Sequence, residues 1–154
     1  MTGKQFRCRI ARSSDTDEVV NLLKELADKI PLKVETKEHI NGLRSLIERM
    51  CGNGKSLVAS SDGHVIGFLL VRLEDYLGRQ GLLIAYVGVT ENWRGKGPFP
   101  ALMARIKVQG LPLWAEVKHA NKSHMATKLV DCFGFRKNGP SPSQGDYFVW
   151  DGHG

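Results

Sequence analysis

The chain has 154 residues, of which 42% are hydrophobic and 25% are charged, a composition typical of one folded domain with a substantial core. The three cysteines are too few and too scattered for a disulfide framework, and the sequence contains neither a signal peptide nor an apolar run long enough to span a membrane. A net charge of +6 favours anionic ligands, a class that includes nucleotide cofactors and nucleic acid. We therefore expect a single domain over residues 1–154, located in the cytoplasm, with no membrane partner.

Hydrophobic periodicity and turn residues divide the chain into short strands and helices. Residues 74–80 are predicted to form a loop because they are rich in charge, and residues 138–145 because their sequence, N-G-P-S-P-S-Q-G, contains two prolines. The predicted elements, in chain order, are a strand at 6–10, helices at 13–30 and 36–50, strands at 56–60, 64–73 and 82–89, a helix at 98–109, a strand at 111–117, a helix at 124–133, and strands at 135–137 and 147–150.

One stretch joins a predicted buried strand to a basic, glycine-bearing turn and then to a helix. The strand ends near Val89, the turn contains Gly95 and Gly97, and the helix begins near Pro98. Glycines let a backbone approach a ligand closely, and the first amides of a helix lack intrahelical partners. The helix dipole also favours negative charge at this end. The stretch therefore predicts an anion-binding site.

The sequence V-T-E-N-W-R-G-K-G at this turn resembles the acetyl-CoA motif of the general N-acetyltransferase (GNAT) superfamily, Gln/Arg-x-x-Gly-x-Gly/Ala. Arg94, Gly95, Lys96 and Gly97 match that motif, whereas Phe99 stands where the family has its second Gly or Ala. The predicted order of elements also matches the family over nearly the whole chain. The resemblance implies an α+β fold, an α/β/α sandwich around a central mixed, mostly antiparallel sheet in the order β-α-α-β-β-β-α-β-α-β-β.

The same resemblance implies that acetyl-CoA is the cosubstrate, and the residue spacing predicts no metal site. Backbone groups of one strand would align the pantetheine arm, the turn would hold the pyrophosphate, and an Asn after the next strand would contact the cofactor. The cofactor-binding residues implied in this way are Val87, Gly88, Val89, Arg94, Gly95, Lys96, Gly97, Pro98, Phe99, Pro100 and Asn121.

Prolines limit how this turn can hold phosphates, because Pro98 and Pro100 have no backbone N–H. The amides of Gly95, Lys96, Gly97 and Phe99 are the remaining donors from residues 95–100. The Phe99 ring either faces the phosphates or points into the core. We predict an affinity for CoA weaker than is usual in the family.

The resemblance also supplies a candidate general base. Glu116 lies five residues before Asn121, the spacing at which some members of the family carry a catalytic Glu; the alternative is a solvent-facing charge on a half-buried strand. The Phe133-Gly134-Phe135 sequence matches the family's helix-ending Gly-Phe, but the Tyr that protonates the departing thiolate is Val130 here. Other residues that could supply that proton are His119, His124, Lys128 and Tyr147, with Cys132 as a weaker candidate.

The function implied is transfer of an acetyl group from acetyl-CoA to an amine, which could belong to a protein, a polyamine, an antibiotic or an aminoacyl-tRNA. The alternative is a non-catalytic protein with the GNAT fold that binds CoA or a protein partner, a reading favoured by Phe99 and Val130. Nucleic acid is disfavoured as a partner because the sequence has no recognised nucleic-acid motif. Assembly into a homodimer stays open.

Overall fold

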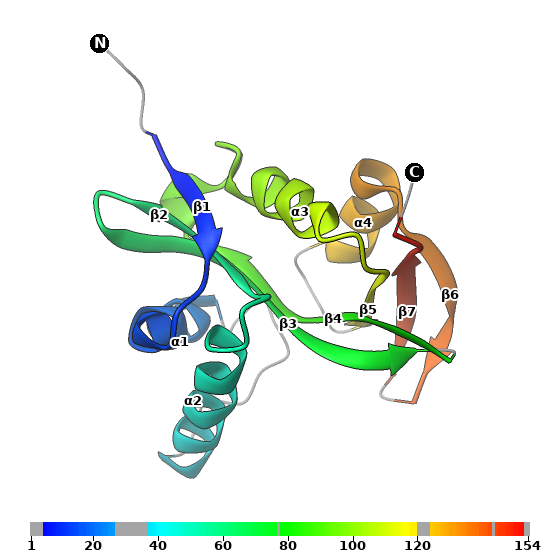
Figure 1. Ribbon diagram of the computed structural model, residues 1–154, viewed down its shortest axis with the longest axis horizontal. Coiled ribbons are helices and arrows are strands. Elements are labelled where there is room, and N and C mark those ends of the chain that lie inside the picture. The colour runs from blue at the N-terminus through cyan, green and yellow to red at the C-terminus, as the bar shows by residue number, and fades with distance from the viewer. Residues whose placement is uncertain (1–4, 27–36, 77, 120–123, 143, 153–154) are drawn as a thin grey trace.

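A seven-stranded mixed sheet in the spatial order β1-β2-β3-β4-β5-β7-β6 runs through the computed structural model of the protein (Figure 1). The structure describes residues 5–26, 37–76, 78–119, 124–142 and 144–152. Neighbouring strands are antiparallel except β4 and β5, which are parallel. The strands are β1 (Arg7–Ile10), β2 (Leu57–Ser61), β3 (His64–Tyr76), β4 (Arg79–Val89), β5 (Leu113–Lys118), β6 (Arg136–Ser141) and β7 (Gly145–Trp150).

Helices cover both faces of this sheet (Figure 1). Helices α1 (Thr16–Leu26) and α2 (Lys37–Cys51) lie on one face, and α3 (Pro98–Val108) and α4 (Met125–Phe133) lie on the other. Two short 3-10 turns, Ser13–Asp15 and Glu91–Trp93, precede α1 and α3. The predicted fold class and the predicted order of strands and helices are confirmed.

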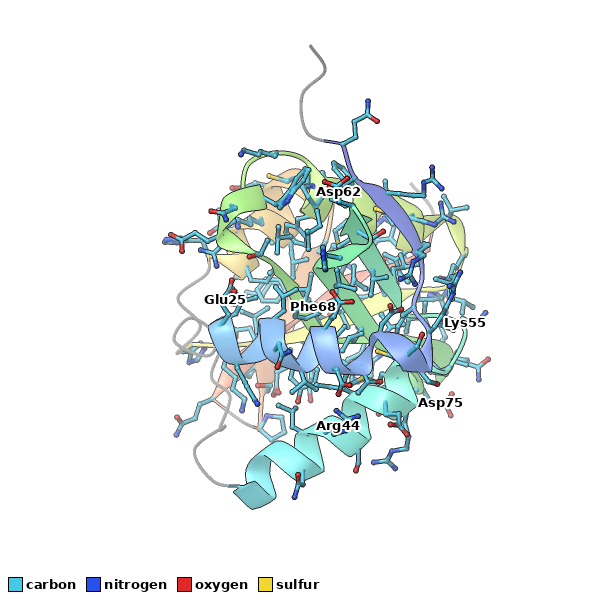
Figure 2. The ribbon with its side chains drawn as sticks, turned by 90° about the vertical axis from the view of Figure 1, so that its left-hand side faces the viewer. Glu25, Arg44, Lys55, Asp62, Phe68 and Asp75 are labelled. Atoms are coloured by element: carbon cyan, nitrogen blue, oxygen red, sulfur yellow. The ribbon has the colours of Figure 1, made fainter. Side chains whose placement is uncertain are left out.

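Two apolar clusters form the core, one on each face of the sheet. Because side chains alternate along a strand, β3 supplies both clusters. Phe68 packs toward α1, behind which it lies in Figure 2, and Leu69 belongs to the cluster under α3 and α4. Both side chains are fully buried, as the apolar centre of the predicted strand requires.

The start of α1 is held by one buried carboxylate. Arg9 donates two hydrogen bonds to Asp15, each 2.8 Å long, and the backbone N–H of Arg12 donates a third of the same length. Farther along, Asp17 of α1 forms an ion pair with Arg44 of α2, which Figure 2 shows beneath α1. These contacts fix the two helices to β1 and to each other.

The predicted loop at residues 74–80 is wrong. Strands β3 and β4 remain paired as far as Tyr76 and Arg79, so most of residues 74–80 belong to strands. Charge does not prevent this pairing, because the strand ends are exposed and Arg72 and Glu74, on one face of β3, form an ion pair at 2.8 Å.

The predicted irregular loop at residues 138–145 is also wrong in part, because Asn138 to Ser141 belong to β6. This strand lies at the edge of the sheet, where a proline leaves no required hydrogen bond unmade. A bulge between Lys137 and Pro140 accommodates Gly139, whose φ is 105°. Most other predicted boundaries differ from those of the structure by a few residues, and the predicted end of the first helix near residue 30 lies outside the described residues.

Asp15→Asn should destabilise the fold in a pH-dependent way. The hydrogen bond from Arg9 is the main reason why the pKa of Asp15 lies below its ordinary value. The ionised carboxylate therefore stabilises the native state above the unfolded pKa of about 4, and this contribution is lost as the pH falls through the folded pKa. We expect urea denaturation to show a loss of about 1.5–3 kcal/mol at pH 7 that shrinks in acid.

The matched control is Asp62→Asn, in the exposed β2–β3 turn labelled in Figure 2. The φ of Asp62 is 51°, which asparagine tolerates well, so the free energy of unfolding should change by less than about 0.5 kcal/mol. Equal losses in the two variants, or a loss for Asp15→Asn that does not depend on pH, would contradict this role.

Gly88→Ala should test how α1 packs on β4. A Cβ at Gly88 would lie 2.5 Å from Leu26 Cδ1 and 3.1 Å from Phe68 Cζ, so these side chains would have to move. We expect a loss of about 1–3 kcal/mol in the free energy of unfolding, partly relieved when Leu26→Ala is added. Gly42→Ala on α2 is the control, because a Cβ there meets nothing within 4 Å. If both alanine variants unfold alike, the close approach at Gly88 is not a constraint.

Candidate cofactor site

The site begins where β4 and β5 separate. The two strands pair only at Leu82–Leu113 and Leu83–Trp114, and beyond these pairs they diverge. The register between β3 and β4 shifts at the same level, which leaves Ala85 as a bulge. A bulge bends its strand and increases the local twist, so it favours the separation. The rest of β4 is paired on one side only, with β3.

A cavity of about 1160 Å³ fills this opening, large enough for a cofactor-sized ligand. Its walls come from β4, β5, α4 and residues 94–100, which we call the 94–100 turn. The cavity reaches both faces of the sheet, since Leu26 and Leu46 line it on the α1–α2 side and Met103 and Phe133 on the α3–α4 side. A ligand could therefore approach from either face.

Backbone groups of β4 point into the opening. The N–H of Thr90 donates to the Ile66 carbonyl of β3 at 2.9 Å. Because backbone direction alternates along a strand, the N–H groups of Val87 and Val89 point the other way, toward β5. The Val89 carbonyl points to the same side, where it accepts a hydrogen bond of 3.3 Å from Arg94 Nε. The Val89 N–H is left as a donor at the edge of the cavity.

The 94–100 turn has the backbone conformation that its glycines predict. Gly95 and Gly97 have φ values of 74° and 104°, in the left-handed region that other residues rarely adopt. Trp93, just before the turn, is 6% exposed and packs edge-on against Phe6, with ring centroids 5.8 Å apart. This buried tryptophan fixes the turn to the body of the protein.

Three of the four predicted amide donors of the turn remain free. The Lys96 N–H donates to the Trp93 carbonyl at 3.2 Å. The amides of Gly95, Gly97 and Phe99 have no acceptor within the part of the chain that the structure describes. Helix α3 begins at Pro98, as predicted, and directs the positive end of its dipole toward the same place. The turn can therefore bind an anion with few but well-placed donors.

The ring of Phe99 contacts α4. It lies edge-on to Phe133 at a centroid distance of 5.1 Å, and Lys128 Nζ lies 5.7 Å from its centre. Phe99 thus packs partly against the core while still lining the cavity, which combines the two alternatives for this side chain. Its contact with Lys128 also brings a cation from α4 close to the turn.

Glu116 lies on the opposite strand of the opening. Ala115 and Val117 face the cluster under α3 and α4, so Glu116 faces the α1–α2 side. It is half-buried, lines the cavity and pairs in register with Tyr147 of β7. Asn121, the other residue implied on this side, lies outside the described residues.

The α4 position at which the family has its acid does not reach the cavity. Val130 is 41% exposed and is absent from the cavity lining. The other predicted proton donors divide into two groups. His124, at the N-terminal end of α4, and Lys128 and Cys132, on α4, line the cavity at intervals of four residues. His119 Nε2 instead lies 3.2 Å from Asp146 Oδ2, and Tyr147 is not part of the lining.

Tyr86 is a cavity residue for which the sequence predicted no role. It lies on β4 next to the bulge, and burial raises the pKa of its phenol above the ordinary value. A raised pKa keeps the phenol protonated near neutral pH, so it can donate a proton or a hydrogen bond. A tyrosine inside an apolar strand gives no sign of this role until the opening beside it is known.

The charged lining of the cavity is mostly cationic. Within the described part of the chain, Arg72, Arg94, Lys118 and Lys128 face one carboxylate, that of Glu116. No group of three His, Cys, Asp or Glu side chains in the described ranges could hold a metal ion. The helices in those ranges are all too short or too polar to cross a membrane. The chemistry of the cavity thus suits an organic anion.

Solved structures share this architecture over almost the whole chain. A diaminobutyrate acetyltransferase from Paenibacillus lautus, solved with its substrate and coenzyme A, is 14% identical with a TM-score of 0.72, covering 97% of this chain and 96% of its own. An acetyltransferase from Thermus thermophilus is 15% identical with a TM-score of 0.71, covering 97% and 99%. PaiA N-acetyltransferase from Thermoplasma acidophilum, solved with coenzyme A, is 17% identical with a TM-score of 0.65, covering 97% and 99%.

No protein-family model and no curated protein matches the sequence. The structural likeness is therefore one of fold, reached at low sequence identity. Because the likeness covers almost the whole chain and includes the seven-stranded sheet, we conclude that the protein has the GNAT acetyltransferase fold.

Proposed function

We propose that the protein is an acetyl-CoA-dependent N-acetyltransferase that transfers an acetyl group to an amine of a protein or small molecule. The observation that carries the proposal is the opening between β4 and β5, with free backbone donors along one wall and a carboxylate on the other. Solved proteins of the same fold hold coenzyme A, and the cavity here has the size and positive charge that such a ligand requires.

The residues present fit coenzyme A. Free amides of Gly95, Gly97 and Phe99 would bind the pyrophosphate, assisted by Arg94. The N–H groups of Val87 and Val89, together with Gly88, would align the pantetheine arm in the manner of a neighbouring strand. Lys96, Pro98 and Pro100 would shape the turn, since the Lys96 amide is already bonded and the prolines have none.

Acetyl-CoA supplies an acyl group activated as a thioester, and the protein's own groups would promote its transfer. The N–H of Val89 would donate a hydrogen bond to the thioester oxygen as charge develops there. Glu116 would accept the proton of the attacking amine, directly or through water, because an ammonium has no free electron pair. The cavity would hold both reactants together, which removes much of the entropic cost of their encounter.

Tyr86 would donate the proton that the departing sulfur needs. It shares the cavity with Glu116, and both side chains face the α1–α2 side of the sheet. The tyrosine is protonated and the glutamate is the only carboxylate among the described lining residues, so the two could act as acid and base. In this assignment Tyr86 would take the place of the family's proton-donating tyrosine, whose position is occupied here by Val130.

The second candidate function is a non-catalytic protein that binds CoA or a protein partner. It is supported by the exposed Val130 and by the reduced number of amides in the turn. The two candidates share the cofactor site and differ in whether Glu116 acts on a substrate. Binding and turnover experiments therefore separate them.

Acetyl-CoA should raise the melting temperature in proportion to its occupancy, since a ligand that binds only the native state stabilises it by mass action. Arg94→Ala should weaken binding by about 10- to 100-fold, because hydrogen bonds to charged groups contribute roughly 1.5–3 kcal/mol each. Arg105→Ala, an exposed change on α3 outside the cavity, is the control and should bind normally. If millimolar acetyl-CoA does not change the melting temperature of the wild type, the cofactor assignment is wrong.

Glu116→Gln should lower kcat by roughly 10²- to 10⁴-fold with little change in the affinity for acetyl-CoA. Glutamine keeps the shape of the side chain but cannot accept the proton. Turnover would be followed by release of the CoA thiol on an amine that the wild type acetylates. Near-full activity of the variant would mean that Glu116 is only a polar side chain at the mouth of the cavity.

A further inference from the structure

Two side chains of opposite charge, Glu116 and Lys118, lie close together in the cavity without forming an ion pair. Glu116 and Lys118 project from the same face of β5, two residues apart, so their Cα atoms are separated by about 6.5 Å. Both line the cavity. Neither forms an ion pair with the other or with any residue in the described ranges.

The other charged lining residue on this side, Arg72, already has a partner. Arg72, which lines the cavity across from β5, is paired with Glu74 at 2.8 Å. Asp146 of β7 lies opposite Val117 and therefore faces the α3–α4 side, away from these two charges. Among the described residues that line the cavity on this side, Glu116 and Lys118 are thus the two charges without an ion-pair partner, and a ligand could satisfy them.

Apolar side chains complete this part of the cavity. Leu26 and Leu46 come from α1 and α2, and Leu83 and Tyr86 from β4. These side chains favour a ligand with an apolar middle part over a polyamine or another ligand with several charges. Each further charge on the ligand would lose its hydration against an apolar wall. The pattern is one negative group, one positive group and an apolar wall.

We propose that the acceptor is a zwitterionic amine, a small amino acid-like molecule whose carboxylate pairs with Lys118 while its amino group meets Glu116. The proposal rests on the proposed function and assigns the substrate class of that site. An amine and a carboxylate on one molecule match two opposite protein charges held this far apart, and charge-assisted hydrogen bonds would orient the amine.

The reaction balances with groups that the cavity contains. The carbon–sulfur bond of the thioester breaks and an amide bond forms between the acetyl carbon and the amine nitrogen. The bound ammonium first loses one proton to Glu116, which frees its electron pair for attack. The sulfur leaves as a thiol with the proton of Tyr86, and the second proton of the amine nitrogen, lost as the amide forms, returns to the Tyr86 phenolate. Lys118 takes no part in these steps and acts as a specificity-determining residue.

The test compares amino acids with the amines formed by their decarboxylation. Suitable pairs are phenylalanine with phenethylamine, leucine with isoamylamine and lysine with cadaverine, each assayed by thiol release from acetyl-CoA. We expect kcat/KM to be about 10- to 100-fold higher for the amino acid of at least one pair. Lys118→Gln should bring that ratio close to one, and Lys118→Arg should largely retain it.

Lys137→Gln, on β6 and outside the cavity, is the matched control and should keep the wild-type ratio. Equal or better turnover of the decarboxylated amines would contradict the proposal, as would a Lys118→Gln variant that keeps the ratio. If no member of any pair is acetylated, the substrate class is wrong. A rise in the melting temperature of the wild type with acetyl-CoA would then show separately whether the protein binds this cofactor.

Discussion

The short parallel pairing between β4 and β5 is the constraint on which the rest of the site depends. Two residue pairs hold these strands together, and beyond Leu83 and Trp114 each continues with one side unpaired. An unpaired strand edge inside a protein is costly unless its N–H and C=O groups find partners. Here the edge lines a cavity, so a ligand can satisfy groups that a neighbouring strand would otherwise bind. The same separation places Glu116 across the cavity from the donors of β4.

The turn that follows β4 combines a small number of free amide donors with a backbone held in place by packing. Of the six residues from 95 to 100, two prolines have no N–H and the Lys96 amide is bonded to the Trp93 carbonyl, which leaves the amides of Gly95, Gly97 and Phe99. Burial of Trp93 against Phe6 holds those three in place before any ligand arrives. A preorganised site loses less conformational freedom on binding, which would partly offset the smaller number of hydrogen bonds in the proposed binding of CoA. Under the proposed function, cations from two directions, Arg94 on the turn and Lys128 on α4, would add attraction for phosphate.

The sequence was most informative where local chemistry determines local structure. The apolar run of β4, the glycines with positive φ and Pro98 at the first position of α3 could all be predicted from residue types, and the order of elements followed from them. The errors fell on the strand ends around residues 74–80 and 138–145, where pairing with a neighbour overrode charge and proline content. The position of Tyr86 in the cavity could not be predicted, and the choice between the two placements of the Phe99 ring stayed open, because both depend on contacts with distant segments. The solved structures of the same fold are 14–17% identical to this chain, so the fold is shared at low sequence identity.

Amide hydrogen exchange, followed residue by residue by NMR with and without CoA, tests the central claim most directly. The amides of Gly95, Gly97 and Phe99 lack acceptors in the described structure and should exchange fast in the free protein. Binding of CoA across the turn should slow these three amides, together with those of Val87 and Val89, and should change the already bonded Lys96 amide far less. The account would be contradicted if CoA binds while these amides remain unprotected, or if protection appears on another surface of the protein.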